Sequence, residues 1–260
     1  ENPRSVGERT NLAQMGGPEP IDYPNPGEAE AARRLQAAGI RYLDGQIGEL
    51  VETLREQGRL EHTLIAVTSD HGEAFGEHGF HGHMVGLYEE TLHVPLVLHY
   101  PPAIAPGTVV TDPVPLRMLH QTLLALVGLP GFEATLLEPG ACGDGFTISE
   151  QMRPLQVLAD HIRGGAPDFS ELDRRALRVR SGNLVLLRET PATGGTPRWL
   201  FFDLASDPGE TQNLWPDPRA VPLRARLADH DQILLTTGKR LSAPEDLREQ
   251  LHALGYMGSP

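Results

Sequence analysis

A run of histidines and acidic residues carries most of the chemistry that this sequence offers. The chain has eleven histidines. Seven of them lie between residues 61 and 100: His62, His71, His78, His81, His83, His93 and His99. Clustered imidazoles are typical of metal sites and of acid–base sites, because imidazole binds metals and changes its charge near neutral pH. We therefore expect the functional site in this segment.

The most informative residues in the segment are Asp70 and His71, which follow the apolar run 64–68 directly. In open α/β sheets, sites form beyond the carboxyl ends of strands. A carboxylate and an imidazole side by side can both ligate a divalent cation, and Gly72 lets the backbone turn there without a Cβ clash. A histidine from residues 78–83 that returns to this cleft could protonate a leaving oxygen or stabilise negative charge.

The other charged residues near this loop are expected to have simpler roles. Four of them are expected to form a solvated or capping face and not to act as acid–base groups: Glu73, Glu77, Glu89 and Glu90. Three histidines are expected to be structural or to lie at the surface: His62, His93 and His99.

The elements predicted around the loop place it in an α/β sheet. Residues 28–58 predict a helix, because apolar residues recur there every three or four positions. The short apolar run 64–68 predicts a buried strand, and the run 94–99 predicts another strand, in which Pro95 suits the start or a sheet edge. A helix that leads into such a strand is half of a βαβ unit. Residues 115–127 predict a further helix that ends at Gly128.

The C-terminal part changes character and predicts a small α+β subdomain. Its predicted strands are residues 176–180, 184–188 and 198–203. Its predicted helices are residues 219–236 and 244–253. The Ser-Gly-Asn turn between the first two strands suits a tight hairpin. Residues 130–175 are weakly patterned and predict only a short helix near 150–162. We expect three regions: an extended lead-in (1–27), an α/β region (28–170) and the subdomain (171–260).

The composition is that of an ordinary globular protein with an acidic balance. The 260 residues include 22 Lys and Arg and 35 Asp and Glu, which give a formal net charge of −13. This balance argues against broad nucleic-acid binding, which needs basic patches. The one cysteine, Cys142, excludes an internal disulfide framework. No apolar run approaches the roughly 20 residues of a membrane span.

Several stretches of the chain resemble the sulfatase family within the alkaline-phosphatase-like superfamily. They are residues 63–73 (Thr-Leu-Ile-Ala-Val-Thr-Ser-Asp-His-Gly-Glu), 76–79 (Gly-Glu-His-Gly), 87–90 (Leu-Tyr-Glu-Glu), 94–97 (Val-Pro-Leu-Val) and 200–214. The resemblance covers roughly residues 28–130 and 176–258. It implies the C-terminal part of an alkaline-phosphatase-like mixed sheet with flanking helices, followed by the small α+β subdomain.

The resemblance also implies a metal-dependent sulfuric ester hydrolase. Asp70 and His71 match the family's metal ligands, with calcium the expected ion and magnesium or manganese as alternatives. His83 best matches the residue that contacts the sulfate ester, and His81 is the second choice. Tyr88 and the glutamates after it, Glu89 and Glu90, are expected to pack and cap the loop. The implied substrate is a small-molecule or glycan sulfate ester, whereas compartment and oligomeric state stay open.

Two features of the family have no match in this sequence. Its formylglycine nucleophile is made from a Cys/Ser-x-Pro-x-Arg motif, whereas Cys142 is followed by Gly-Asp-Gly-Phe. The family's pair of adjacent metal-binding aspartates is also missing. Both features belong to the first half of the family's catalytic domain. We therefore expect a C-terminal portion that is inactive alone, with the formylglycine in the missing N-terminal part.

Three other functions remain open at this point. The superfamily includes phosphate and phosphonate ester hydrolases, which share the Asp-His pair. A non-catalytic binding protein could keep the sulfatase fold without its chemistry. A small histidine-rich transition-metal binder would hold zinc through His81 and His83.

Overall fold

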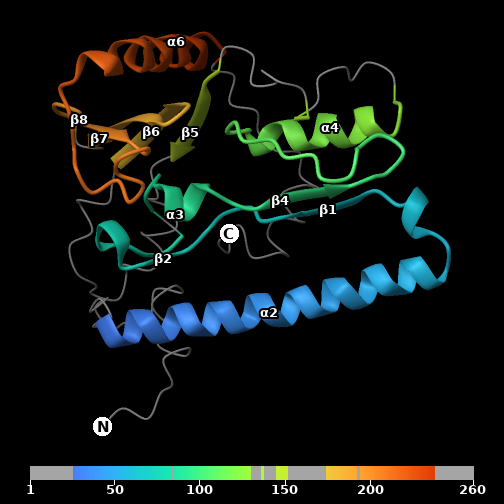
Figure 1. The fold of residues 1–260 in the computed structure, drawn as a ribbon. Helices are drawn as coiled ribbons and strands as arrows, with labels where there is room; N and C mark the ends of the chain where they lie inside the picture. The colour runs from blue at the N-terminus through green and yellow to red at the C-terminus, as the bar shows by residue number, and fades with distance from the viewer. Residues whose placement is uncertain are drawn as a thin grey trace, which may run out of the picture.

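The computed structural model describes residues 26–83, 85–129, 136–137, 145–151, 174–191 and 194–237. A long helix, α2 (Pro26–Glu56), runs below a pair of strands, and a four-stranded sheet lies to one side of them (Figure 1). This mixture of sheets and helices confirms the expected α/β class. Residues 1–25 of the predicted lead-in lie outside the described part of the chain.

Helix α2 confirms the helix predicted over residues 28–58. It ends before Gly58, which has the left-handed φ of +67° that favours glycine. The helix packs near its start against β2 (Ala74–Phe75) and near its end against η1 (Leu60–His62). Between these contacts its apolar stripe is exposed, with Ile40 58% exposed.

Strands β1 (Ile65–Thr68) and β4 (Leu96–His99) form where the two apolar runs predicted them. They pair antiparallel, with Ile65 opposite His99, and not as a βαβ unit, because their connection contains no crossover helix. The expectation that the first of them is buried is wrong for this chain. Strand β1 alternates between half-buried and exposed residues, and β4 is half-buried except at the exposed Val97, since the described sheet has only two strands.

The connection between β1 and β4 is folded against itself. Strand β2 pairs with β3 (His81–Gly82) around the short helix η2 (Glu77–Gly79), and α3 (Glu89–Leu92) follows. The start of the loop hydrogen-bonds to α3, because Gly72 N donates to Thr91 O (2.8 Å) and Glu73 N donates to Glu90 O (2.9 Å). A Cβ on Gly72 would lie 2.0 Å from Glu90 O. Gly72 is therefore required by the close approach of α3.

We expect Gly72→Ala to lower the free energy of unfolding by about 1–3 kcal/mol or more, because a new methyl group would meet a backbone oxygen. Gly48→Ala is the matched control, since nothing lies within 4 Å of a Cβ on that α2 residue. It should instead raise the stability by roughly 0.5–1 kcal/mol. Urea denaturation measures both changes, and equal effects of the two variants would contradict the close approach.

The next helix also forms as predicted. The turn η3 (Leu116–Met118) continues into α4 (Leu119–Leu126), and Gly128 follows with a φ of +77°. The helix lies above β1 and β4 (Figure 1). No helix among the described residues is long and apolar enough to cross a bilayer.

The C-terminal sheet contains four antiparallel strands in the order β5-β6-β7-β8. Their bounds are β5 (Thr147–Gln151), β6 (Arg174–Ser181), β7 (Leu184–Pro191) and β8 (Arg198–Asp203). The predicted hairpin is confirmed, and Gly182 supplies its positive φ of +56°. Strand β5 was not foreseen: Glu150 and Gln151 were expected in a short helix, but they pair with β6. The rest of that predicted helix lies outside the described residues, as does the helix predicted over 244–253.

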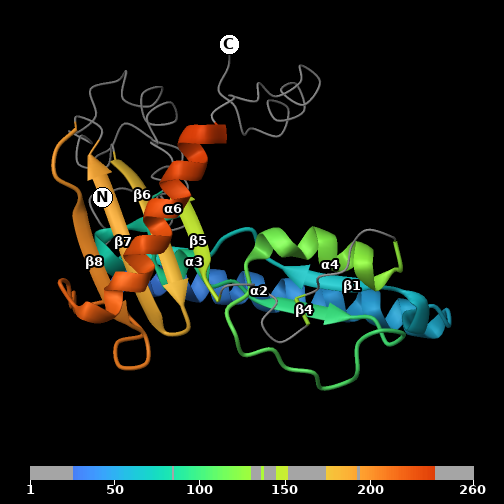
Figure 2. The same ribbon diagram turned by 90° about the horizontal axis from the view of Figure 1, so that it is seen from above.

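The two faces of this sheet are covered by different parts of the chain. After η5 (Pro218–Ala220), helix α6 (Val221–Thr237) lies along one face (Figure 2). That face is packed by the buried side chains Leu177, Val179, Leu186, Phe201, Leu223 and Leu227. On the other face, Ala176 and Val185 pack against Leu87 and Tyr88 from the loop before α3. The sheet therefore supports the loop that carries the histidines.

Candidate functional site

The predicted metal ligands lie at the end of β1. Asp70 Oδ1 is 3.7 Å from His71 Nε2, so the carboxylate and the imidazole face the same space. Both side chains are open to solvent, with 72% of Asp70 and 41% of His71 exposed. The neighbouring His71 and a backbone hydrogen bond hold the pKa of Asp70 below its usual value. The carboxylate is therefore ionised and accessible to a cation.

The ring of His71 is oriented by the backbone. His71 Nδ1 lies 2.8 Å from Gly72 O, and a carbonyl oxygen can only accept a hydrogen bond. Nδ1 therefore carries the proton in the neutral ring, and Nε2 keeps a free lone pair on the side of Asp70. A ligating histidine in proteins is held in this way, with one nitrogen anchored and the other directed at the metal.

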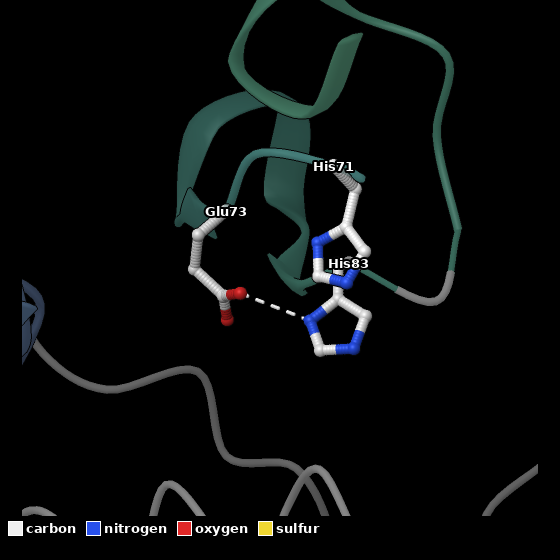
Figure 3. Close-up of side chains that lie close together, drawn as sticks. All are labelled: His71, Glu73 and His83. Atoms are coloured by element: carbon white, nitrogen blue, oxygen red, sulfur yellow. Dashed lines mark hydrogen bonds and ion pairs between the residues drawn. The ribbon is translucent and has the colours of Figure 1, made fainter. Parts of the chain in front are cut away.

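His83 returns to the same place from the far end of the loop. Its ring stacks on that of His71, with the centroids 3.9 Å apart (Figure 3). His83 Nδ1 lies 2.9 Å from Glu73 Oε2, which fixes the ring and leaves Nε2 directed elsewhere. Ligand atoms of His71, Glu73 and His83 all lie within 4.8 Å of one another. The loop thus brings two imidazoles and a carboxylate into one cluster next to Asp70.

Of the predicted site residues, the structure brings together Asp70, His71 and His83. His81 lies in β3, and its side chain is outside the described part of the chain. The expectation that Glu73 is a solvated group is wrong, because it is only 16% exposed and holds His83. The spacing His71-x-Glu73 could have suggested this, since alternate residues of an extended segment point to one side.

Glu89 and Glu90 were expected to lie on a solvated or capping face and to pack and cap the loop, and the structure shows Glu89 packed against the C-terminal sheet. Arg178 on β6 is buried, and its Nη2 donates to Glu89 Oε1 (2.5 Å). Arg180 Nη1 donates to Glu89 Oε2 (2.8 Å), and Glu89 N donates to Glu210 Oε2 (2.8 Å). These bonds fix α3 against the C-terminal sheet. Because Gly72 and Glu73 hydrogen-bond to α3, the same network supports the site.

The remaining expectations near the loop hold in part. Glu77 caps the turn after β2, because its carboxylate accepts a hydrogen bond from Phe75 N. Tyr88 packs as expected and is 5% exposed. His62 lies at the surface. His93 is also exposed and lies 3.6 Å from the Glu89 carboxylate.

A cleft of about 680 Å³ opens beside the Asp70–His71 pair. One wall comes from the segment after β1 and from β4, and the other comes from the C-terminal sheet, including Ile148 and Arg180. Arg117 also contributes to the lining. A volume of this size falls within the range of roughly 300–1,000 Å³ that small-molecule sites occupy.

The donor set fits a divalent cation. Ionised carboxylates and a neutral imidazole with a free Nε2 are suitable ligands, and Asp70 and His71 present them to one space. Calcium takes about 6–8 oxygen ligands, so these two residues supply only part of its coordination sphere. The residues therefore form part of a metal site, which further ligands or water must complete.

Comparison with known proteins finds similarity to sulfatases. Residues 10–129 match the family described as Sulfatase. The chain is 31% identical to a choline-sulfatase from Rhizobium meliloti over 75% of this chain and 35% of the relative. It is 39% identical to an N-acetylglucosamine-6-O-sulfatase from Bacteroides thetaiotaomicron over 68% of this chain and 31% of the relative. The chain thus spans about a third of the length of the curated relatives it matches.

Solved structures show the same fold. The structure of BT4656 in complex with D-glucosamine-2-N,6-O-disulfate superposes with a TM-score of 0.59 at 20% identity, over 90% of this chain and 45% of that chain. The structure of BT1596, a 2-O GAG sulfatase, also gives a TM-score of 0.59, at 18% identity, over 84% of this chain and 46% of that chain. These likenesses confirm the expected alkaline-phosphatase-like fold.

Proposed function

Because residues 10–129 match the sulfatase family, we propose that this chain forms part of a metal-dependent hydrolase that cleaves sulfate esters. The observation that carries the proposal is the stacking of His83 on His71, next to Asp70. It joins a pair of metal-binding groups to a separate imidazole held by Glu73. A sulfate ester needs both, a cation for its negative oxygens and a proton for the leaving oxygen.

In this proposal Asp70 and His71 hold a divalent cation, for which calcium is our first choice. Such an ion, when bound, neutralises sulfate oxygens and polarises the ester. The Nδ1–H of His71 stays on Gly72 O, so only Nε2 takes part. The nucleophile expected from the family is a formylglycine, which the motifs of this sequence do not encode.

His83 is proposed to act on the leaving group. The Glu73 carboxylate holds Nδ1–H of His83 at 2.9 Å, so Nε2 is the atom that faces outward. In its protonated form, His83 donates the Nε2 proton to the oxygen that leaves as the S–O bond breaks. Glu73 is a positioning residue here, because it stabilises the imidazolium and fixes the ring. His81 remains the second choice for this role.

The proposed substrate is a small-molecule or glycan sulfate ester. The relatives named above are a choline-sulfatase and an N-acetylglucosamine-6-O-sulfatase. The first name refers to a small-molecule sulfate ester and the second to a sugar sulfate ester. The cleft of about 680 Å³ beside Asp70 has room for a small organic group or a sugar. Arg117 in its lining adds positive charge suited to an anionic substrate.

The activity is tested by measuring sulfate release from an aryl sulfate, with the protein that contains these residues. Parallel assays with the matching aryl phosphate and phosphonate discriminate the other hydrolases of the superfamily. We expect turnover of the sulfate ester and much slower turnover of the other two. A preference for the phosphorus esters would favour the alternative hydrolase, and binding of the sulfate ester without turnover would favour a non-catalytic protein.

We expect the 260-residue chain to bind calcium only weakly, with a Kd above the micromolar range, because Asp70 and His71 supply few of the about six ligands that the ion needs. Titration calorimetry measures this affinity. Asp70→Asn should abolish the binding heat, whereas Asp44→Asn on the exposed side of α2 should leave it unchanged. Sub-micromolar binding, or equal effects of the two variants, would contradict the assignment.

A further inference from the structure

A second group of ligand-type side chains lies apart from the stacked histidines. Atoms of His78, Glu90 and Glu210 that could ligate a metal all lie within 4.8 Å of one another. His78 Nε2 is 3.7 Å from Glu90 Oε1, which is too long for a hydrogen bond. The three residues come from η2, from α3 and from the loop after β8. We call these three residues the inner cluster.

In the inner cluster Glu210 is buried, His78 and Glu90 are half-buried, and some acceptors are unused. The Glu210 side chain is 1% exposed, and those of His78 and Glu90 are 14% and 17% exposed. Glu90 Oε1 and Glu210 Oε1 are each shielded from solvent and accept no hydrogen bond. Arg178 Nη2 lies 3.1 Å from Glu210 Oε1 as an ion pair, but it donates its hydrogen bond to Glu89. Two buried carboxylate oxygens therefore point into the cluster without a donor.

The local charges leave one carboxylate uncompensated. Glu89, Glu90 and Glu210 face two cations, Arg178 and Arg180. A buried charge without a partner is costly, so the excess negative charge calls for a bound proton or a cation. Burial raises the pKa of Glu210 to about 7 and also raises the pKa of Glu90.

The backbone holds two of the ligands in an uncommon conformation. His78 (φ +52°) and Glu210 (φ +51°) are the two non-glycine residues with positive φ in the described part of the chain. Such conformations are sterically unfavourable for side chains with a Cβ, and they concentrate at functional sites. Both residues contribute to the same cluster. The ring of His78 is also fixed, because it stacks on Tyr88 with the centroids 3.6 Å apart.

We propose that His78, Glu90 and Glu210 bind a borderline transition-metal cation of the zinc class, distinct from the ion at Asp70 and His71. One imidazole and two carboxylates form a ligand set suited to zinc, which binds nitrogen and oxygen at about 2.0–2.2 Å. The ligand atoms of the three residues lie within 4.8 Å of one another. Small side-chain movements can therefore bring each atom to such a distance from a bound ion. A nitrogen ligand suits zinc better than calcium, which takes oxygen. The cation supplies the positive charge that the cluster lacks.

The test uses zinc itself with the 260-residue chain, freed of metal by a chelator. Because His71, Glu73 and His83 could also bind zinc, the titration is done in a His71→Ala/His83→Ala background. We expect that background to bind one zinc ion per chain. Adding Glu90→Gln should weaken the affinity at least about tenfold, since it removes a ligand charge but keeps the side-chain volume. Cobalt in place of zinc should give a visible absorption band that Glu90→Gln alters.

Controls separate the site from folding and from surface binding. His93→Ala removes an exposed histidine outside the cluster and should leave the zinc affinity unchanged. His78→Ala should abolish binding, and circular dichroism without metal shows whether that variant folds. If it does not fold, Glu90→Gln decides. The proposal is overturned if the background variant binds no zinc, or if Glu90→Gln leaves the affinity unchanged.

Discussion

Replacing Arg178 with alanine is expected to lower the free energy of unfolding by about 3–5 kcal/mol, because the change leaves buried carboxylates without their cation. The Arg178 side chain is only 3% exposed. It lies 2.5 Å from Glu89 Oε1 and 3.1 Å from Glu210 Oε1, and it also donates to Leu87 O (3.3 Å). The variant keeps Leu87 O and the two carboxylates in place and removes the cation that they face.

Urea denaturation of the chain and the variant measures this loss. Arg198→Ala is the matched control, because Arg198 also pairs with a glutamate, Glu189, but is 64% exposed. An exposed pair of this kind contributes only about 0–1 kcal/mol. Adding Glu89→Gln and Glu210→Gln to Arg178→Ala should recover part of the loss, since it removes the unpaired charges. A loss no larger than that of Arg198→Ala would show that the network does not stabilise the fold.

The second large effect concerns turnover and depends on the proposed function. In the protein that contains these residues, Asp70→Asn is expected to lower kcat/KM for an aryl sulfate on the order of 1000-fold. The substitution keeps the shape of the side chain but removes the ionised carboxylate from the metal ligands. A loss of several kcal/mol of transition-state stabilisation corresponds to this factor, at about 1.4 kcal/mol for each tenfold change.

The metal dependence of the loss identifies its cause. If Asp70 ligates the cation, raising the calcium concentration should restore part of the activity of the variant. His83→Ala should lower kcat without this rescue, because its proposed role is proton transfer. Asp44→Asn and His62→Ala change exposed residues outside the site and serve as controls with unchanged rates. Full activity of Asp70→Asn at low calcium would remove Asp70 from the metal site.

Much of the local structure can be predicted from the sequence. The apolar stripe of α2 and the strands of the C-terminal hairpin follow from periodicity, which depends only on neighbouring residues. The position of Asp70 and His71 at the end of β1 follows in the same way, because they come directly after an apolar run. Strand β5 was missed, since its residues Thr147–Gln151 alternate weakly and gain their partner only from β6.

Burial was harder to predict than secondary structure. The run 64–68 predicts a buried strand, yet β1 alternates between half-buried and exposed residues. An apolar residue is buried only where another part of the chain covers it, and that depends on tertiary packing. The same reasoning applies to α2, whose stripe formed as predicted but is largely uncovered among the described residues.

The sequence by itself indicated the resemblance to the sulfatases, the α/β class and the candidate residues Asp70, His71 and His83, because these are encoded in short motifs. Tertiary structure alone decided which carboxylates act with them. Glu73 became the partner of His83 through the fold of the loop, and Glu89 became buried against Arg178, 89 residues away. A glutamate is expected at the surface unless a cation meets it, and only the folded chain brings that cation close. The inner cluster has the same origin, since Glu210 reaches α3 only in the folded chain, where it accepts a hydrogen bond from Glu89 N, 121 residues away in sequence.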